Sequence, residues 1–262
     1  MRRYFSILFI TALSLGSCEE VIDIDLNTSE PALVARAEII QDSTAKVKLT
    51  YTGSYFDTTG AGIEEAAMVS IDDNSGRSET LEYTGEGVYR GNIIRGKENS
   101  EYTLNISTGD RLYSGRSYLN SKPEILKLEY EKMDIPHYME RNIYSLTTVI
   151  TDDPGNDNYY MLRFYRNGEL MNDYYPIFSD RYLEADTIGY KDYRLDFYRT
   201  DTVRVELYAI DNGVYNYFNL VNDVLFSAMS SSTPFNPESN ISGGILGYFM
   251  ASSFDSDSII IH

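Results

Sequence analysis

A long stretch of period-two alternation constrains the fold of this chain more than any other feature of its sequence. From about residue 32 to residue 119, apolar and polar residues alternate in short segments; for example, Val47, Leu49 and Tyr51 alternate with polar residues. Turn signals separate these segments at intervals of about 8–12 residues. Because successive side chains of a strand point to opposite faces, the pattern predicts about seven short strands and no helix. We therefore expect a mainly β fold that begins with an antiparallel sandwich of the immunoglobulin-like or prealbumin-like type.

A second β-rich part is expected after Lys122-Pro123-Glu124, where the proline and the residue before it disfavour both helix and strand pairing. The later segments with strand character are residues 126–130, 144–151, 159–166 and 202–210. Residues 167–200 are rich in tyrosine and acidic residues and show only weak periodicity. We interpret them as a long hairpin or loop excursion.

One amphipathic helix is expected in this second part, at about residues 212–229. Asp211 and Asn212 can cap its start by accepting backbone N–H bonds. Apolar residues then recur at three- and four-residue steps, which is typical of a helix packed on a sheet. They are Val214, Tyr217, Phe218, Val221, Val224, Leu225 and Ala228. The predicted domains are thus a β-sandwich at residues 31–122 and a second β-rich domain at residues 123–262.

The first 30 residues have the organisation of a bacterial lipoprotein signal followed by a tether. Two arginines precede an apolar run from Tyr4 to Leu15. This run spans only about 18 Å as a helix, which is too short to cross a bilayer. Two small residues and then Cys18, the only cysteine, follow it. We predict removal of residues 1–17, attachment of diacylglycerol and palmitate at Cys18, and an acidic tether at residues 18–30. The alternative is an ordinary secretory signal with a chance cysteine.

The charge of the chain limits its partners. There are 40 Asp+Glu against 22 Lys+Arg, which gives a formal net charge of −18. Such a surface repels phosphate backbones, so we expect no nucleic-acid partner. Glu19 and Glu20 directly follow Cys18. They fit a plain solvated tether, but they also resemble the acidic surface-export signal of Bacteroidota lipoproteins.

The sequence offers little for catalysis or metal binding. The only histidines are His137 and His262, so no Ser-His-Asp arrangement or multi-histidine zinc site is expected. Gly243-Gly244-x-x-Gly247 lacks the spacing of a dinucleotide loop and is interpreted as a tight turn. The acidic segments 72–76 and 152–158 are interpreted as plain Asx and glycine turns, with calcium binding as the alternative. We therefore predict no catalytic residue, no metal and no cofactor.

Several motifs together resemble one known family. Acidic residues follow the lipid cysteine, and later motifs combine acidic, aromatic and glycine residues at characteristic places. The motifs are Glu64-Glu65-Ala66, Val69-x-Ile71-x-Asp73, Tyr102-x-Leu104-x-Ile106, Asp152-Asp153, Asn158-Tyr159-Tyr160, Ile210-Asp211, Asn236-Pro237, Ser239-Asn240-Ile241 and Gly247-Tyr248-Phe249. The chain resembles the Bacteroidota lipoprotein family labelled domain of unknown function 4249 over nearly its whole length. It departs from the pattern by one extra residue between Gly244 and Gly247.

The resemblance implies an outer-membrane lipoprotein that faces the cell surface and works with a TonB-dependent receptor. The ligand could be a peptide, a glycan or another small nutrient. For the partner surface, we select Tyr159, Tyr160, Tyr174, Tyr175 and Arg181, because tyrosine and arginine typically dominate interfaces. The alternatives are a pilus-like, adhesive sandwich that polymerises by strand exchange and, third, a glycan or peptide hydrolase.

Overall fold

The structure, a computed structural model, describes residues 30–53, 62–134, 142–152, 155–171, 173–183, 185–227 and 235–262. Cys18, Glu19, Glu20 and His137 lie outside these residues, so the predictions that concern them stay predictions. The chain divides into two units, residues 1–30 and residues 31–262. The described strands and helix belong to the second unit.

Strands make up most of this unit, as the alternating pattern predicts. The first half contains β1 (Leu33–Ile40), β2 (Thr44–Tyr51), β3 (Met68–Asp73), β4 (Ser78–Thr80), β5 (Glu82–Gly85), β6 (Val88–Arg95), β7 (Ser100–Thr108) and β8 (Arg111–Leu119). The second half contains β9 (Ile125–Lys132), β10 (Ile143–Thr151), β11 (Tyr159–Arg166), β12 (Glu169–Met171), β13 (Ile177–Ser179), β14 (Thr187–Lys191), β15 (Phe197–Tyr198), β16 (Thr202–Ile210), β17 (Ile241–Ser242) and β18 (Leu246–Ile260). The mainly β fold expected from the sequence is confirmed.

The first half forms a sandwich around one apolar core. A five-stranded sheet in the order β17-β8-β7-β3-β4 faces the β1-β2-β6-β5 part of a nine-stranded sheet. Their inner faces meet through the apolar members of the alternating pattern, for example Ile39 and Leu49 from one sheet and Leu104 from the other. These side chains are inaccessible to solvent, so the sandwich is stabilised by the core that the pattern predicts.

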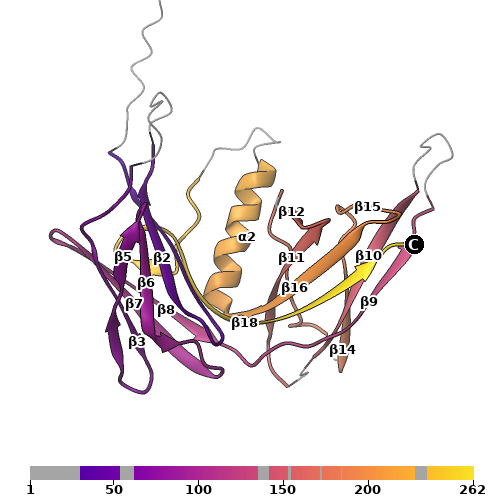
Figure 1. The fold of residues 1–262 in the computed structure, drawn as a ribbon, viewed down its shortest axis with the longest axis horizontal. Helices are drawn as coiled ribbons and strands as arrows, with labels where there is room; N and C mark the ends of the chain where they lie inside the picture. The colour runs from indigo at the N-terminus through magenta and orange to yellow at the C-terminus, as the bar shows by residue number, and fades with distance from the viewer. Residues whose placement is uncertain are drawn as a thin grey trace, which may run out of the picture. The chain divides into compact units, whose positions relative to one another are not determined.

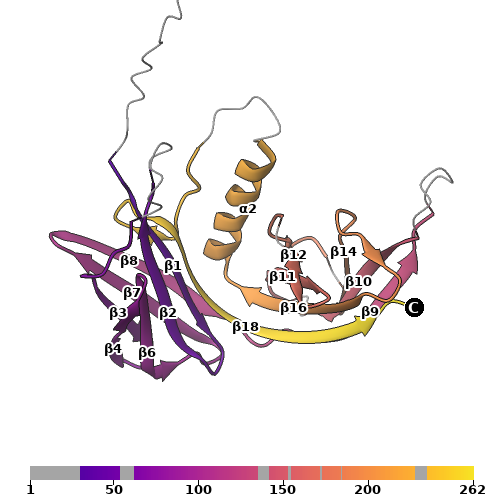
Figure 2. The ribbon, with the colours of Figure 1, turned by 45° about the horizontal axis from the view of Figure 1, so that its top comes forward.

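The long strand β18 joins the first half of the unit to the second. Its start pairs in parallel with β1, from Val34 opposite Leu246 to Ile40 opposite Ser252. Its remainder pairs antiparallel with β16. The nine-stranded sheet therefore continues without a break through β18, which runs beneath the helix in Figures 1 and 2. The predicted division of domains at residues 122 and 123 stays a prediction.

The region 167–200 contains more regular structure than the expected loop excursion. Its four short strands, β12 to β15, pair with β11 or β10. Strand β10 also pairs with β9, and this small sheet covers a second apolar core against β11 and β16. Periodicity does not reveal these strands because they have only two to five residues each.

The predicted helix is present as α2 (Asn212–Ser227). Its start agrees with the prediction, whereas residues 228 and 229 lie outside the described residues. Val214 and Phe218 are its buried residues, and they pack with Met161, Tyr208 and Met250 of the nine-stranded sheet. No helix within the described part of the chain is both long and apolar enough to cross a membrane.

Candidate interaction surface and pocket

A buried carboxylate organises the tyrosine-rich region beside α2. Asp192 is only 6% exposed and accepts hydrogen bonds from the hydroxyl groups of Tyr174 and Tyr190. Arg194 binds both carboxylate oxygens through its Nε and a terminal nitrogen, each at 3.1 Å. Burial alone would raise the pKa of Asp192, but these donors outweigh burial and lower it. Asp192 is therefore a fixed anion that orients three surrounding side chains.

Arg194 also stacks on aromatic rings. Its guanidinium carbon lies 3.8 Å from the centre of the Tyr174 ring and 5.4 Å from that of Phe226, in the last part of α2. Both distances are within the range of cation–π attraction. The side chain of Arg194 is nevertheless 53% exposed. It thus presents a pre-oriented guanidinium group and an aromatic ring to the solvent.

Neighbouring apolar side chains extend this exposed area. Tyr175, Leu225 and Phe226 are 40–42% exposed. The side chain of Asn222 fixes the segment of Tyr175 to α2, because it binds the backbone nitrogen of Tyr175 at 2.9 Å and its carbonyl oxygen at 2.7 Å. We call Tyr175, Arg194, Leu225 and Phe226 the α2 surface. It combines a fixed arginine with aromatic and aliphatic groups, as the centres of protein interfaces do.

A polar pocket of about 550 Å³ lies where the β8–β9 connection, the start of β11 and the start of α2 meet. This volume is within the usual range for small-molecule sites. Its lining includes carboxamides, carboxylates and tyrosines: Asn99, Tyr118, Asn120, Asp157, Asn158, Tyr159, Tyr160, Asp211 and Asn212. The lysine among the described lining residues, Lys122, forms an ion pair with Asp255 at 2.8 Å. The pocket therefore suits neutral or cationic polar molecules better than anions.

Asp211 holds together the elements that line this pocket. One carboxylate oxygen accepts the backbone N–H of Val214 at 2.9 Å and so caps α2. The other oxygen accepts the N–H of Tyr118 at 3.0 Å and the hydroxyl group of Ser117. Ser117 in turn accepts the buried N–H of Ala251 of β18 at 2.8 Å. The capping residue predicted from the sequence thus also ties α2 to β8 and β18.

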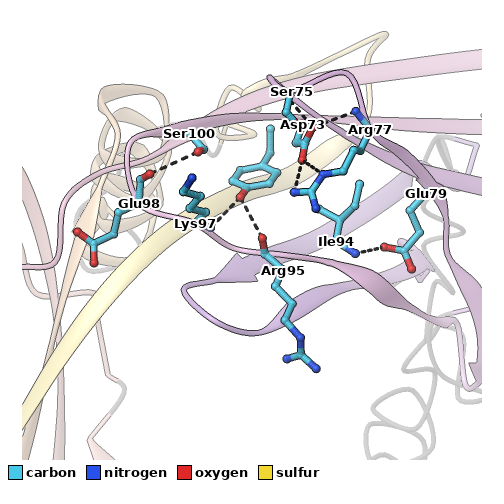
Figure 3. Close-up of polar contacts among 10 residues, drawn as sticks. Asp73, Ser75, Arg77, Glu79, Ile94, Arg95, Lys97, Glu98 and Ser100 are labelled. Carbon is cyan, nitrogen blue, oxygen red and sulfur yellow. Dashed lines mark hydrogen bonds and ion pairs between the residues drawn. The ribbon is translucent and has the colours of Figure 1, made fainter.

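The acidic segment 72–76 forms an Asx turn. Asp73 accepts the backbone N–H groups of Ser75 and Arg77, each at 3.0 Å, and the Arg77 side chain reaches back to form an ion pair with it. Figure 3 shows Asp73 turned toward Ser75 and Arg77, with Glu79 accepting the N–H of Ile94 nearby. Across the described residues, no group of three or more His, Cys, Asp or Glu side chains is placed to hold a metal ion.

The glycine segment 243–247 also has the role expected from the sequence. Gly243, Gly244 and Gly247 all have positive φ angles. A Cβ at Gly247 would lie 1.9 Å from the carbonyl oxygen of Ala35, so a side chain would prevent the close approach of β18 to β1. The interpretation as a tight turn with close backbone packing is confirmed.

The five residues selected for the partner surface do not form one patch. Tyr174 is buried against Asp192, and Tyr175 belongs to the α2 surface. Tyr159 and Tyr160 line the pocket, and Tyr160 is buried. Arg181 is exposed and pairs with Asp157 of the pocket lining at 3.2 Å. The sequence does not predict the contacts of Asp192, Arg194 and Phe226, because nothing in the local pattern shows that residue 194 meets residue 226.

The match to known proteins agrees with the motifs. A family model described as "Domain of unknown function (DUF4249)" matches residues 19–258. The chain belongs to this family. The resemblance predicted from the sequence motifs is thereby confirmed, and the match covers all described strands except the last residues of β18. No curated protein matches the chain.

Proposed function

We propose that this DUF4249 protein is a surface-exposed outer-membrane lipoprotein that serves as an accessory or ligand-capturing lid subunit of a TonB-dependent nutrient transporter. The observation that carries the proposal is the α2 surface, where a carboxylate-fixed arginine and exposed apolar groups lie together. Such a surface favours the binding of a protein partner, because the arginine is already fixed and little side-chain freedom is lost when the partner binds. No catalytic role is part of the proposal.

The polar pocket supports the ligand-capturing part of the proposal. Its volume of about 550 Å³ suits a small nutrient or one end of a larger one. Its carboxamide and carboxylate groups favour ligands with many hydroxyl or amide groups, such as a peptide or a glycan. No feature of the described residues specifically favours the strand-exchange or hydrolase alternatives.

Co-purification from native outer membranes tests the partner. A tag at the C-terminus should recover a large barrel receptor together with the lipoprotein. Phe226→Glu places a charge in the α2 surface and should reduce the recovered receptor at least tenfold. Leu112→Glu is the matched control, since Leu112 is 77% exposed on β8 and lies outside the α2 surface. Recovery of the wild-type lipoprotein alone would contradict the accessory role.

The membrane anchor is tested separately. Cys18→Ala removes the only thiol that could be lipidated. The variant should move from the membrane fraction to the soluble fraction, while its far-UV circular dichroism stays that of a β protein. If Cys18→Ala still fractionates with membranes, the lipoprotein assignment is wrong.

A further inference from the structure

A basic strip crosses three adjacent strands of this acidic protein. Arg36 of β1 lies opposite Lys48 of β2, and Lys46 of β2 lies opposite Arg90 of β6. All four side chains are exposed and project from the face of the sheet that points away from the sandwich core. We call Arg36, Lys46, Lys48 and Arg90 the basic strip.

The strip is unusual because like charges face each other in both pairs. Like charges at directly opposite positions of neighbouring strands destabilise a sheet. Within the described residues, none of the four cations forms an ion pair or a side-chain hydrogen bond. The charges therefore repel one another, and nothing in this part of the chain neutralises them by direct contact.

Two glutamates flank the strip without pairing with it. Glu38 lies opposite Lys46 in the register, but its carboxylate accepts the hydroxyl group of Tyr248 at 2.8 Å and lies 3.5 Å from Arg163. Glu82 lies opposite Arg90 at the edge of the sheet. The strip thus keeps a local excess of positive charge in a chain whose formal net charge is −18.

We propose that the basic strip binds an acidic, extended segment of a partner protein. The inference goes beyond the proposed function by naming the chemistry of a second contact, and it rests on the existence of a protein partner. Lys46 and Lys48 are two positions apart on one strand, about 7 Å. An extended segment with Asp or Glu at alternate positions presents carboxylates at the same spacing, and arginine binds carboxylates in a bidentate manner.

The negative charge of the rest of the chain favours a short protein segment over a membrane as the ligand of the basic strip. A bilayer rich in anionic lipid would cover a wider area than the strip and would meet Glu38 and Glu82 as well as the four cations. At physiological salt the Debye length is about 8 Å, so charges farther apart than this are largely screened from one another. A narrow acidic segment is therefore attracted by the strip and is little repelled by the more distant negative charges of the chain. The observations therefore favour a segment over a lipid surface.

The probe is a short peptide with glutamate at alternate positions, added to the isotope-labelled mature chain that begins at Cys18. We expect saturable amide shifts confined to β1, β2 and β6. Binding should weaken by about tenfold between about 10 mM and about 150 mM salt, because screening acts on exposed charges. The same peptide with glutamine in place of glutamate should produce no shifts.

Matched variants show whether the basic strip is responsible for binding the glutamate peptide. Lys46→Glu/Lys48→Glu should lose at least nine-tenths of the affinity, and the neutral Arg36→Gln/Arg90→Gln pair should lose a similar share. Lys127→Glu/Lys132→Glu makes the same change of charge on exposed residues of β9 and should bind as the wild type does. Far-UV circular dichroism shows that each variant is folded.

Three results would overturn the inference. The first is the absence of shifts with the glutamate peptide, and the second is an equal loss of binding in the β9 control. The third is strip-dependent binding to vesicles of phosphatidylethanolamine and phosphatidylglycerol without binding of the peptide. The proposed function fails independently, since it requires recovery of a receptor through the α2 surface, whatever the peptide does.

Discussion

Single carboxylates of this acidic chain have defined structural roles, and Asp73 is the clearest case for pH dependence. Burial would raise the pKa of Asp73, but donors from Ser75 and Arg77 outweigh it and lower the pKa to about 2. A carboxyl group with a depressed pKa stabilises the fold above its unfolded pKa, near 4, and this contribution disappears as the pH falls toward 2.

We therefore predict that Asp73→Asn removes at most about 2 kcal/mol of stability at neutral pH and much less near pH 2. Urea unfolding at several pH values measures the difference. Asp110→Asn is the control, since Asp110 is an exposed residue of the β7–β8 turn. A loss for Asp73→Asn that stays constant between pH 6 and about pH 2 would contradict the assigned role.

Gly247 gives a second prediction at the residue scale. Its φ is +97°, and an added Cβ would meet the carbonyl oxygen of Ala35 at 1.9 Å. Gly247→Ala should cost about 3 kcal/mol or more, because backbone strain and a steric clash combine. Gly244→Ala should cost about 1 kcal/mol, since that glycine also has a positive φ but has no atom within 4 Å of the added Cβ. Thermal unfolding compares the two, and equal losses would exclude the clash as the cause.

At the scale of elements, the sequence predicts what depends on local pattern. The strands of the sandwich follow from alternation, and the start of α2 follows from Asp211 and the spacing of Val214 and Phe218. The short strands β12 to β15 do not follow, because segments of two to five residues are too short to show a period. The tyrosines of residues 167–200 resemble those of a polar loop in sequence, yet Tyr174, between β12 and β13, is buried and donates its hydroxyl group to Asp192.

The attachment of α2 depends on Asp211, and this gives a prediction for the element. Asp211→Ala removes the helix cap and the bonds to Ser117 and Tyr118. We expect a loss of about 2–4 kcal/mol of unfolding free energy. Asp211→Asn keeps an acceptor for the cap and should lose less unfolding free energy than Asp211→Ala. Asn212→Ala, at the exposed neighbour, should change stability by less than about 0.5 kcal/mol.

Urea unfolding followed by circular dichroism gives these values. Hydrogen exchange can then show whether the effect is local to the element. The amides of the first turn of α2 should lose protection in Asp211→Ala and keep it in Asn212→Ala. Unchanged protection in both variants would show that the cap and the bonds to β8 are not what holds the helix.

At the scale of the whole unit, the decisive contacts join residues far apart in the sequence. The parallel pairing of β1 with β18 joins residues about 210 positions apart, as the pair Val34 and Leu246 shows. The α2 surface brings Arg194 to Phe226, and the pocket brings Asn99 to Asp211. No local period or spacing encodes such pairings. The sequence therefore predicts the elements and the capping residue, but not the assembly of the candidate site.

The continuous sheet leads to a prediction about cooperativity. Because β18 is hydrogen-bonded both to β1 and to β16, the two halves of the unit should unfold together. Phe249→Ala creates a cavity in the core of the sandwich and should cost about 3–5 kcal/mol. Native-state hydrogen exchange should show this same loss for the slowest amides of β2 and for those of β11. Leu207→Ala, in the other core, should lower the free energy of hydrogen exchange for both sets of amides in the same way. If each variant instead affected only its own half, the halves would be separate folding domains divided near residue 122, and β18 would be a connection between them.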